Sequence, residues 1–301
     1  MMQQAKTPEQ CRMMEGRTLR RKLLAQVQDA VKALGKKGVL PSLHVVLVGE
    51  SKPSKIYVNA KIRTAEKVGI EAVFHHLPED ANQKDLEKLL TTLSDDDAVH
   101  GVLLQLPLPK HLDQRSALAC IAPVKDVDGL TPENIGRLTL VDSNSHQPCT
   151  PLGIMRLLAA YGVEVKGKQA TVLGRSQLVG RPLAEMLSQA DATVTACHKF
   201  TPDISVYTKQ ADILFVATGN PALVTGDMLK PGAVVVDVGI NRLENNDVVG
   251  DCDEQTCRHA ASLLTPVPGG VGPMTVATLM TNTIDACRRQ HDLEAIEWKV
   301  A

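Results

Sequence analysis

The sequence has no long apolar run and no excess of charge of one sign. No stretch of its 301 residues approaches the roughly 20 apolar residues that a membrane-spanning helix needs. The N-terminal residues MMQQAKTPEQCRMMEG also lack an apolar signal core. The 33 basic and 34 acidic side chains nearly cancel, so no field of one sign favours nucleic acid or a charged membrane surface. These absences predict a cytoplasmic protein that binds neither nucleic acid nor membrane.

Cysteine pairs at redox or metal spacing are lacking as well. The seven cysteines are odd in number and form no C-x-x-C motif, which is typical of a chain in a reducing compartment. Cys252, Cys257 and His259 lie close together, but no second ligand pair at zinc spacing accompanies them. The sequence therefore predicts no metal site.

Short apolar runs alternate with helical patterns along the chain. In the first half, SLHVVLVG (42–49) and VHGVLLQLP (99–107) are typical of buried strands. Two segments between them, 55–69 and 83–94, have the pattern of helices, and the first is expected to stop at Gly69. The second half repeats this alternation with the runs QATVLG (169–174), ATVTAC (192–197), DILFVATG (212–219) and GAVVVDVG (232–239), and the helical segment RPLAEMLSQ (181–189). The pattern predicts an α/β fold with parallel sheets covered by helices on both faces.

The boundary between two domains is visible near Thr150. This residue is a favourable N-cap, and Pro151 after it suits the first position of a helix. We therefore expect one domain at 150–275 and another built from 1–149 and 276–301. The last helix would then return to the first domain.

The turn after the run 169–174 has features of a nucleotide site. Gly174 and Gly180 enclose a strand-to-helix turn where backbone N–H groups can approach a phosphate. Their spacing is not G-x-G-x-x-G, so an ordinary structural turn is an equal alternative. Arg175 projects from the same turn, and Lys199 stands where NAD-selective sites usually carry an acidic residue. Positive charge there suits the additional phosphate of NADP, although Lys199 alone is also typical of a solvated surface.

Several polar residues of the first half are candidates for a second site. Tyr57, one of three tyrosines, and Lys61 are four residues apart and share a helix face, as many solvated pairs do. Gln105 follows a strand, where α/β proteins bind ligands, although a neutral amide there often only closes a turn. Asp126 and Asp128 precede Gly129, a pattern that by itself is typical of an Asx turn.

The loop TPVPGGVGPMT (265–275) holds three prolines and three glycines immediately before a helical pattern. Glycine lets the backbone pass close to a flat ligand, and proline fixes its path at low entropic cost. Pro273 is expected in the first turn of the helix, where proline is tolerated. The alternative is an ordinary tight connection.

Ten segments together identify a resemblance to a known family. They are SKIYVNAK, GVLLQLPLP, KDVDGL, PCTPLG, VLGRSQLVGRP, ATVTACH, DILFVATG, VVVDVGIN, VVGD and TPVPGGVGPMT. In this order they resemble the bifunctional methylenetetrahydrofolate dehydrogenase/methenyltetrahydrofolate cyclohydrolase family, from about Gly16 to about Arg288. The resemblance implies an N-terminal α/β folate-binding domain, a Rossmann-like NADP domain with a parallel sheet, and a homodimer.

The resemblance also implies the activity and the residues of the folate site. The enzyme would oxidise 5,10-methylenetetrahydrofolate with NADP and hydrolyse the product to 10-formyltetrahydrofolate, in one-carbon metabolism that serves purine biosynthesis. Lys61 takes the place of the catalytic lysine, Tyr57 that of a tyrosine stacking on the aminobenzoyl ring, Gln105 that of a glutamine bonding the lysine, and Asp128 that of a carboxylate holding the pterin. The remaining expected folate contacts are Val58, Asn59, Ala60, Leu104, Leu106, Pro268, Gly269, Gly270, Val271, Gly272, Pro273, Met274, Thr275 and Val276.

For the cofactor, the resemblance implies contacts from Gly174, Arg175, Ser176 and Ile240. Lys199 departs from the family, where many members have serine. Three alternatives stay open at this point: another two-domain NADP-dependent dehydrogenase of a small keto or hydroxy acid, a dehydrogenase-only member of the family, and a non-catalytic folate- or nucleotide-binding module.

Overall fold

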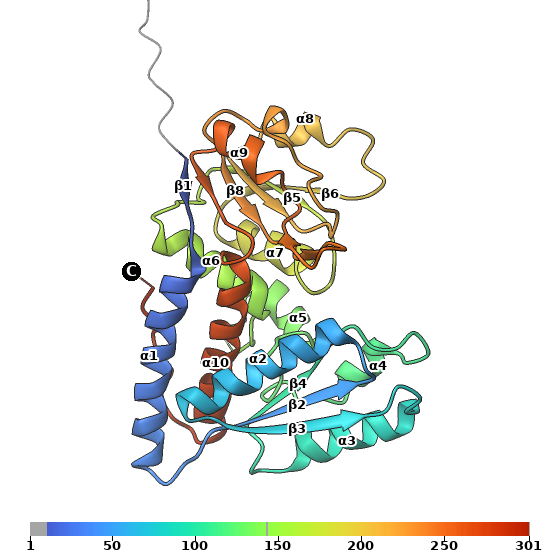
Figure 1. Ribbon diagram of the computed structural model, residues 1–301. Coiled ribbons are helices and arrows are strands. Elements are labelled where there is room, and N and C mark those ends of the chain that lie inside the picture. The colour runs from blue at the N-terminus through green and yellow to red at the C-terminus, as the bar shows by residue number, and fades with distance from the viewer. Residues whose placement is uncertain (1–10, 143, 301) are drawn as a thin grey trace, which may run out of the picture. The chain divides into compact units, whose positions relative to one another are not determined.

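The computed structural model describes residues 11–142 and 144–300, which form two compact units. We call Arg20–Gly153 with Thr275–Val300 the three-strand unit, and 11–19 with Ile154–Met274 the six-strand unit, after their sheets. Helices α1 (Gly16–Gly35), α6 (Cys149–Ala160) and α10 (Val271–Gln290) each contain a boundary between the two (Figure 1).

The sheet of the three-strand unit is parallel, with the order β3-β2-β4. Strands β2 (Ser42–Val48) and β4 (Gly101–Leu104) confirm the two predicted runs. β3 (Glu71–Leu77) was not predicted, because this edge strand alternates exposed and half-buried residues without an apolar run. Val46, Leu86, Val102 and Leu104 belong to one buried cluster on this sheet.

The other helices of this unit include the two that the sequence predicts. α2 (Lys52–Val68) ends at Gly69, whose φ of 88° lets the N–H groups of Gly69 and Ile70 bond back to the carbonyls of Glu66 and Ala65. α3 (Gln83–Asp95) is capped by Asn82, whose side chain accepts from the Asp85 N–H. Two short helices follow, α4 (Gln114–Ala119) and α5 (Pro132–Thr139).

The six-strand sheet has the order β1-β11-β8-β7-β5-β6, and every neighbouring pair in it is parallel. The four predicted runs are the neighbouring strands β8, β7, β5 and β6, of which β6 lies at the edge of the sheet, and this confirms the Rossmann-like parallel sheet. Strand order reverses next to β5, so the carboxyl ends of β5, β6 and β7 border one crevice. The strands are β1 (Arg12–Met13), β5 (Gln169–Leu173), β6 (Thr193–Cys197), β7 (Ile213–Val216), β8 (Val234–Asp237) and β11 (Leu263–Leu264).

The first residues differ from the expected domain division. The expected division assigns all of 1–149 to the first domain, but β1 pairs with β11, and the N–H groups of Arg12 and Met14 donate to the carbonyls of Ser262 and Leu264. The backbone of 11–19 therefore completes the six-strand sheet. The pairing gives ladder partners to the backbone groups on the outer side of β11.

Short elements connect the strands of the six-strand sheet, and β9 with β10 forms a separate antiparallel hairpin. They are α7 (Gly180–Gln189), α8 (Ser205–Thr208), the 3₁₀ turn η1 (Gly226–Met228), β9 (Asn241–Arg242), β10 (Val248–Val249) and α9 (Glu254–Ala260).

Two helix starts can be compared with the sequence. α6 begins at Cys149, so Thr150 lies inside the helix and is not its N-cap; its hydroxyl is 3.0 Å from that of Thr275. α10 begins at Val271, which places Pro273 in the first turn as predicted. After Met274 the helix belongs to the three-strand unit, where Asn282 donates to the Val127 carbonyl at 2.9 Å.

The C-terminal segment after α10 lies against the three-strand unit. The indole N–H of Trp298 donates to the Asp285 carboxylate at 3.0 Å, and Lys299 and Gln26 exchange two hydrogen bonds. None of the helices within 11–142 and 144–300 is long and apolar enough to cross a membrane.

Two buried carboxylates, Asp237 and Asp251, organise the loops at the carboxyl edge of the six-strand sheet. Asp237 accepts from the N–H groups of Gly239, Asp251 and Cys252 at 2.8–2.9 Å. Asp251 in turn accepts from the N–H groups of Thr218 and Gly219 at 2.6 and 2.8 Å. Burial raises the pKa of Asp237 to about 6, although the three N–H donors oppose the rise.

This pKa predicts a pH dependence of stability. The folded carboxyl binds a proton more tightly than the unfolded one, so Asp237 stabilises the fold at low pH and loses that contribution as pH rises through about 6. We expect the free energy of unfolding of wild type, relative to Asp237→Asn, to be about 2 kcal/mol larger at about pH 4.5 than at about pH 7. Urea unfolding at both pH values measures it, with Asp247→Asn as a surface control. If the difference in free energy of unfolding between wild type and Asp237→Asn were the same at both pH values, the raised pKa of Asp237 would be contradicted.

Candidate active site

Lys61 and Gln105 form a direct contact at the carboxyl end of β4. Lys61 lies on α2, and its Nζ donates to Gln105 Oε1 at 3.0 Å. Gln105 is held in place because its side-chain Nε2 donates to the Leu106 carbonyl at 2.7 Å and its backbone N–H donates to the Val46 carbonyl on β2. Both side chains are half-buried. A lysine amine is thus held by a neutral partner at the carboxyl end of β4.

Asp128 belongs to the same neighbourhood through Cys149. The Cys149 thiol is fully buried at the start of α6, and burial raises its pKa well above the usual value. The nearby Asp128 carboxylate raises that pKa further, whereas the charge of Lys61 opposes the rise. Lys61 and Asp128 therefore both act on one sulfur atom. Asp128 itself is half-buried.

Cys149 and Asn282 were missed as members of this neighbourhood. Asn282, on α10, donates to the carbonyls of Val127 and Gln147 at 2.9 and 3.0 Å and lies 3.7 Å from the Cys149 sulfur. It thereby connects the residue before Asp128 to the start of α6. The PCTPLG segment was a usable signal for Cys149. Asn282 gave none, because it lies more than 120 residues away inside an ordinary helical pattern.

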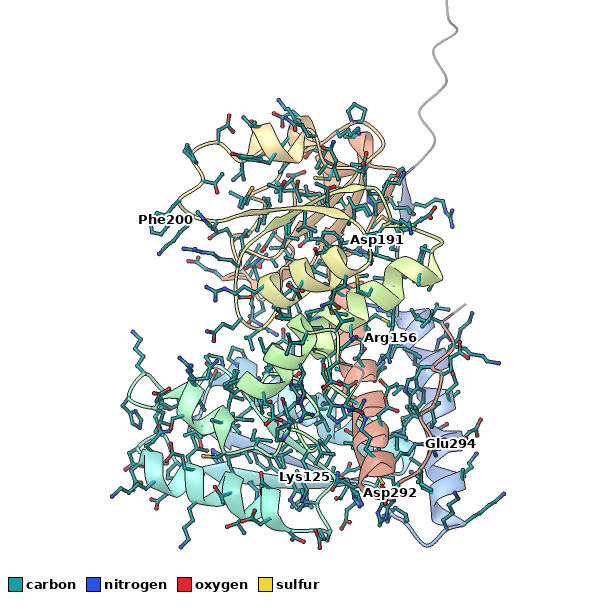
Figure 2. The ribbon with its side chains drawn as sticks, turned by 180° about the vertical axis from the view of Figure 1, so that it is seen from behind. Lys125, Arg156, Asp191, Phe200, Asp292 and Glu294 are labelled. Atoms are coloured by element: carbon teal, nitrogen blue, oxygen red, sulfur yellow. The ribbon has the colours of Figure 1, made fainter. Side chains whose placement is uncertain are left out.

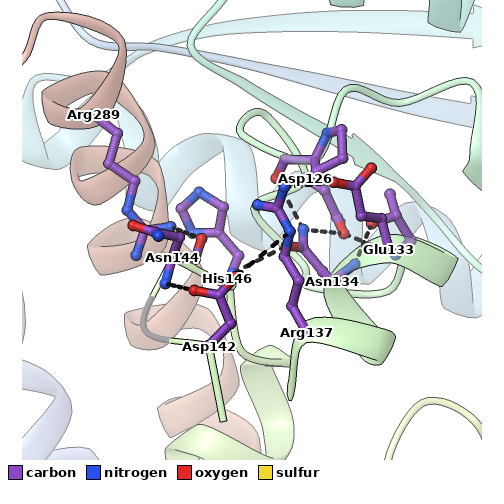
Figure 3. A network of polar contacts seen from close by, with 10 residues as sticks. Asp126, Glu133, Asn134, Arg137, Asp142, Asn144, His146 and Arg289 are labelled. Atoms are coloured by element: carbon purple, nitrogen blue, oxygen red, sulfur yellow. Dashed lines mark hydrogen bonds and ion pairs between the residues drawn. The ribbon is translucent and has the colours of Figure 1, made fainter. Parts of the chain in front are cut away.

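Asp126 is a structural residue that shapes the loop carrying Asp128. It is buried and accepts from Gly129 N–H, Thr131 N–H and Asn134 Nδ2 at 2.8–2.9 Å (Figure 3). Gly129 has φ 70°, and a Cβ there would lie 2.5 Å from the His146 carbonyl oxygen. The turn after Asp128 therefore needs glycine, and the carboxylate of Asp126 holds it closed.

The other expected folate contacts of α2 and β4 divide by exposure. Tyr57 is 40% exposed, and Asn59 and Ala60 are also at the surface. Val58 and Leu104 are at most 2% exposed and Leu106 is 9% exposed, so these three side chains pack in the interior. Their assignment as ligand contacts stays a prediction. With side chains buried, they could contact a ligand only through backbone atoms or support neighbouring residues that do.

The loop before α10 is tightly packed against its own surroundings. Gly269 has φ 124°, and its carbonyl accepts from the Gly16 N–H at 2.9 Å. A Cβ on Gly270 would lie 2.7 Å from Thr265 Cβ, so only glycine fits there. A Cβ on Gly272 would lie 3.6 Å from Ile240 Cδ1, which places the predicted loop beside the predicted cofactor residue.

A cavity of about 640 Å³ opens at the reversal of strand order in the six-strand sheet. Gly174, Arg175 and Ser176 line it after β5, His198 and Lys199 after β6, and Ala217 and Thr218 after β7. Gly174 has φ 108°, and a Cβ there would lie 2.1 Å from the Ala217 oxygen. Ser176 Oγ accepts from the N–H groups of Val179 and Gly180 at the start of α7. Ile240 is not among the lining residues.

This cavity fits a phosphorylated cofactor in size and in charge. Arg175 and Lys199 are both exposed, so their cations are available to a ligand. Lys199 Nζ lies 4.9 Å from the centroid of the Phe200 ring, and Phe200 is 68% exposed at the edge of the unit (Figure 2). The Lys199 ammonium thus makes a cation–π contact with the exposed Phe200 ring.

Two family models match the chain and leave few residues uncovered. The model described as "Tetrahydrofolate dehydrogenase/cyclohydrolase, catalytic domain" matches residues 14–128. The model described as "Tetrahydrofolate dehydrogenase/cyclohydrolase, NAD(P)-binding domain" matches residues 148–291. The first contains Lys61, Gln105 and Asp128, and the second contains the cavity.

Individual relatives agree with the family models. The bifunctional protein FolD of Moorella thermoacetica is 48% identical over 276 residues, which cover 92% of this chain and 98% of that protein. The crystal structure of FolD from Campylobacter jejuni has a TM-score of 0.91 at 45% identity, covering 92% of this chain and 98% of that one. The Trypanosoma brucei enzyme, complexed with NADP cofactor and inhibitor, has a TM-score of 0.90 at 37% identity, covering 93% and 98%. The chain belongs to the tetrahydrofolate dehydrogenase/cyclohydrolase family.

Proposed function

We infer that this protein oxidises 5,10-methylenetetrahydrofolate with NADP and then hydrolyses 5,10-methenyltetrahydrofolate to 10-formyltetrahydrofolate. The observation that carries the inference is the 3.0 Å contact between Lys61 and Gln105, in a chain that both domain models of the family match. The keto or hydroxy acid dehydrogenase is not favoured, because it gives the cluster of Lys61, Gln105 and Asp128 no purpose. The non-catalytic module is not favoured either, because the lysine and the Arg175 turn are both intact.

The oxidation requires the protein to align folate with NADP and does not require an acid or base residue. The folate nitrogens expel a hydride from the methylene carbon, and NADP, when bound, accepts it. We propose that Asp128 accepts hydrogen bonds from the amino-pyrimidine edge of the pterin and that Tyr57 stacks on the aminobenzoyl ring. On the cofactor side, Gly174 lets the backbone turn closely, and Arg175 and Ser176 bind phosphate.

The hydrolysis needs proton transfer at a defined place. Water adds to the methenyl carbon and loses a proton. A ring nitrogen then takes up a proton as its bond to that carbon breaks, and the hydroxyl group loses its proton as the formyl C=O forms. We propose that Lys61 carries these protons, because its amine is the titratable group fixed at the site by a neutral partner. Gln105 orients the amine. Because its amide is neutral, it does not hold the amine in the charged form, whereas a carboxylate partner would.

The wider setting follows the family. We propose that the protein works as a homodimer in the cytoplasm, where its product supplies one-carbon units to purine biosynthesis. The net charge of −1 agrees with small-molecule ligands and with no nucleic acid or membrane partner. The mass of the protein in solution, measured by light scattering, tests the dimer.

Lys61→Met should abolish the cyclohydrolase reaction while the protein stays folded and still binds NADP. Loss of a positioned proton carrier lowers such a rate by about 10²–10⁴-fold. The measurement is the decay of methenyltetrahydrofolate, corrected for the spontaneous rate. Lys67→Met, an exposed lysine on the same helix, is the matched control. Decay near the wild-type rate would remove Lys61 from the mechanism.

Asp128→Ala should weaken folate binding about tenfold to a hundredfold and leave NADP binding nearly unchanged. The reason is that an unpaired donor edge in a closed site costs about 1–3 kcal/mol. Calorimetric titration with each ligand separately measures both affinities, and Asp97→Ala is an exposed control in the same unit. An equal loss for both ligands, or no loss for folate, would reduce Asp128 to a turn residue.

NADP should be preferred over NAD, with Arg175 contributing most of the preference and Lys199 a smaller part. Arg175 can bind a phosphate with two parallel hydrogen bonds, whereas the exposed Lys199 is screened by salt and contributes about 1 kcal/mol or less. The measurement is kcat/KM for both cofactors in wild type, Arg175→Ala and Lys199→Ser at low and high salt. Lys209→Ser is an exposed control in the same unit. An equal effect of Lys199→Ser on both cofactors would exclude contact with the 2′-phosphate.

A further inference from the structure

Two histidines and a cysteine converge at the C-terminal end of α10, outside the proposed active site. His100 directly precedes β4, Cys287 lies in the last turns of α10, and His291 directly follows it. The Nε2 atoms of His100 and His291 are 3.1 Å apart. A ring nitrogen of each histidine lies within 4.8 Å of the Cys287 sulfur. We propose that these three residues bind a divalent transition-metal ion, with Zn²⁺ as the preferred one.

The local structure explains why the three side chains meet. Cys287 and His291 are four residues apart, and His291 N–H still donates to the Arg288 carbonyl at 3.2 Å, so both side chains leave the same face of the helical turn. Gln290 Nε2 donates to the His100 carbonyl at 2.9 Å, which fixes the end of the helix against the start of β4. Hydrogen bonds that do not involve the three candidate ligand side chains therefore help to hold these side chains together.

The spacing of the ligand atoms is close to that of a zinc site. Tetrahedral Zn²⁺ with Zn–N of about 2.0–2.1 Å and Zn–S of about 2.3 Å places two nitrogens about 3.3 Å apart and a nitrogen about 3.6 Å from sulfur. The observed nitrogen–nitrogen distance of 3.1 Å is about 0.2 Å below this value, and the 4.8 Å limit exceeds the nitrogen–sulfur value by about 1.2 Å. His100 and Cys287 are buried and His291 is exposed, so a water molecule can reach the fourth position.

The chemistry of the donor set also favours a borderline-soft cation. One thiol and two imidazoles suit Zn²⁺ better than Mg²⁺ or Ca²⁺, which prefer oxygen. The thiol of Cys287 is buried and makes no hydrogen bond with the described residues. When a metal binds, it displaces the thiol proton, and no hydrogen bond of Cys287 to the described residues is broken.

Ser42 provides the outer contact that a metal-bound His100 needs. Its hydroxyl lies 3.1 Å from His100 Nδ1 and donates to the Ala98 carbonyl at 2.7 Å, so it can accept from Nδ1–H while Nε2 faces the metal. Without metal, Nδ1 can instead accept from the Ser42 N–H at 3.2 Å, and that bond is lost on loading. The ammonium of Lys125 also acts on His100 and opposes a cation. The site should therefore bind Zn²⁺ more weakly than a closed four-ligand site.

Titration of the full-length protein with Zn²⁺ and with Co²⁺ tests the site. We expect one ion per chain, a sulfur-to-cobalt charge-transfer absorption, and a Tm that rises with Zn²⁺ and falls again with a chelator. His291→Gln and Cys287→Ser should each weaken Zn²⁺ binding by about a hundredfold or more, and Cys287→Ser should remove the charge-transfer band. Both variants should keep wild-type dehydrogenase activity, which reports a native fold.

Two controls keep the outcome decisive. His259→Gln tests the segment with Cys252 and Cys257, and Cys120→Ser tests a partly exposed thiol elsewhere; both should bind Zn²⁺ as wild type does. His291 is exposed, so its variant should fold even if Cys287→Ser does not. Wild type without one-to-one binding, or His291→Gln with unchanged affinity, would overturn the proposal.

Discussion

Buried carboxylates hold the loops that carry the candidate site residues. Where parallel strands end, the chain leaves the sheet and its N–H groups lose their ladder partners, although they stay buried. Asp126 supplies the missing acceptor in the three-strand unit, and Asp237 and Asp251 supply it in the six-strand unit. Each accepts from N–H groups of at least two residues. The loops are thus fixed by a charge inside the protein rather than by apolar packing.

This arrangement separates the residues that fold the site from those that could act in it. Asp126 is buried and fully bonded, whereas Asp128, two residues later, is half-buried and acts with Lys61 on the thiol of Cys149. In the six-strand unit, Asp251 fixes Thr218 at the rim of the cavity, while Arg175 and Lys199 remain exposed there. The loops are held by the buried carboxylates, so the charges of Arg175 and Lys199 are not needed to hold them and stay available to a ligand.

The sequence predicted the central strands because buried parallel strands are continuous apolar runs. It did not predict β3, whose half-exposed edge has no such run, or the pairing of β1 with β11, which depends on a partner about 250 residues away. The spacing of Tyr57 and Lys61 places them on one helix face, but by itself it is typical of a solvated pair, and their assignment to the site comes from the family resemblance. Asn282 and the His100, Cys287 and His291 cluster could not be found from the sequence, because each depends on the way in which α10 packs against distant segments. Local patterns record which face a residue lies on, but not what that face meets.

The position of Trp298 decides what the protein's own fluorescence can report. It is the single tryptophan of the chain. Its indole N–H is bonded to Asp285 on α10, within a C-terminal segment that is also fixed to Gln26. Emission excited at the indole band therefore follows the docking of this segment on the helix.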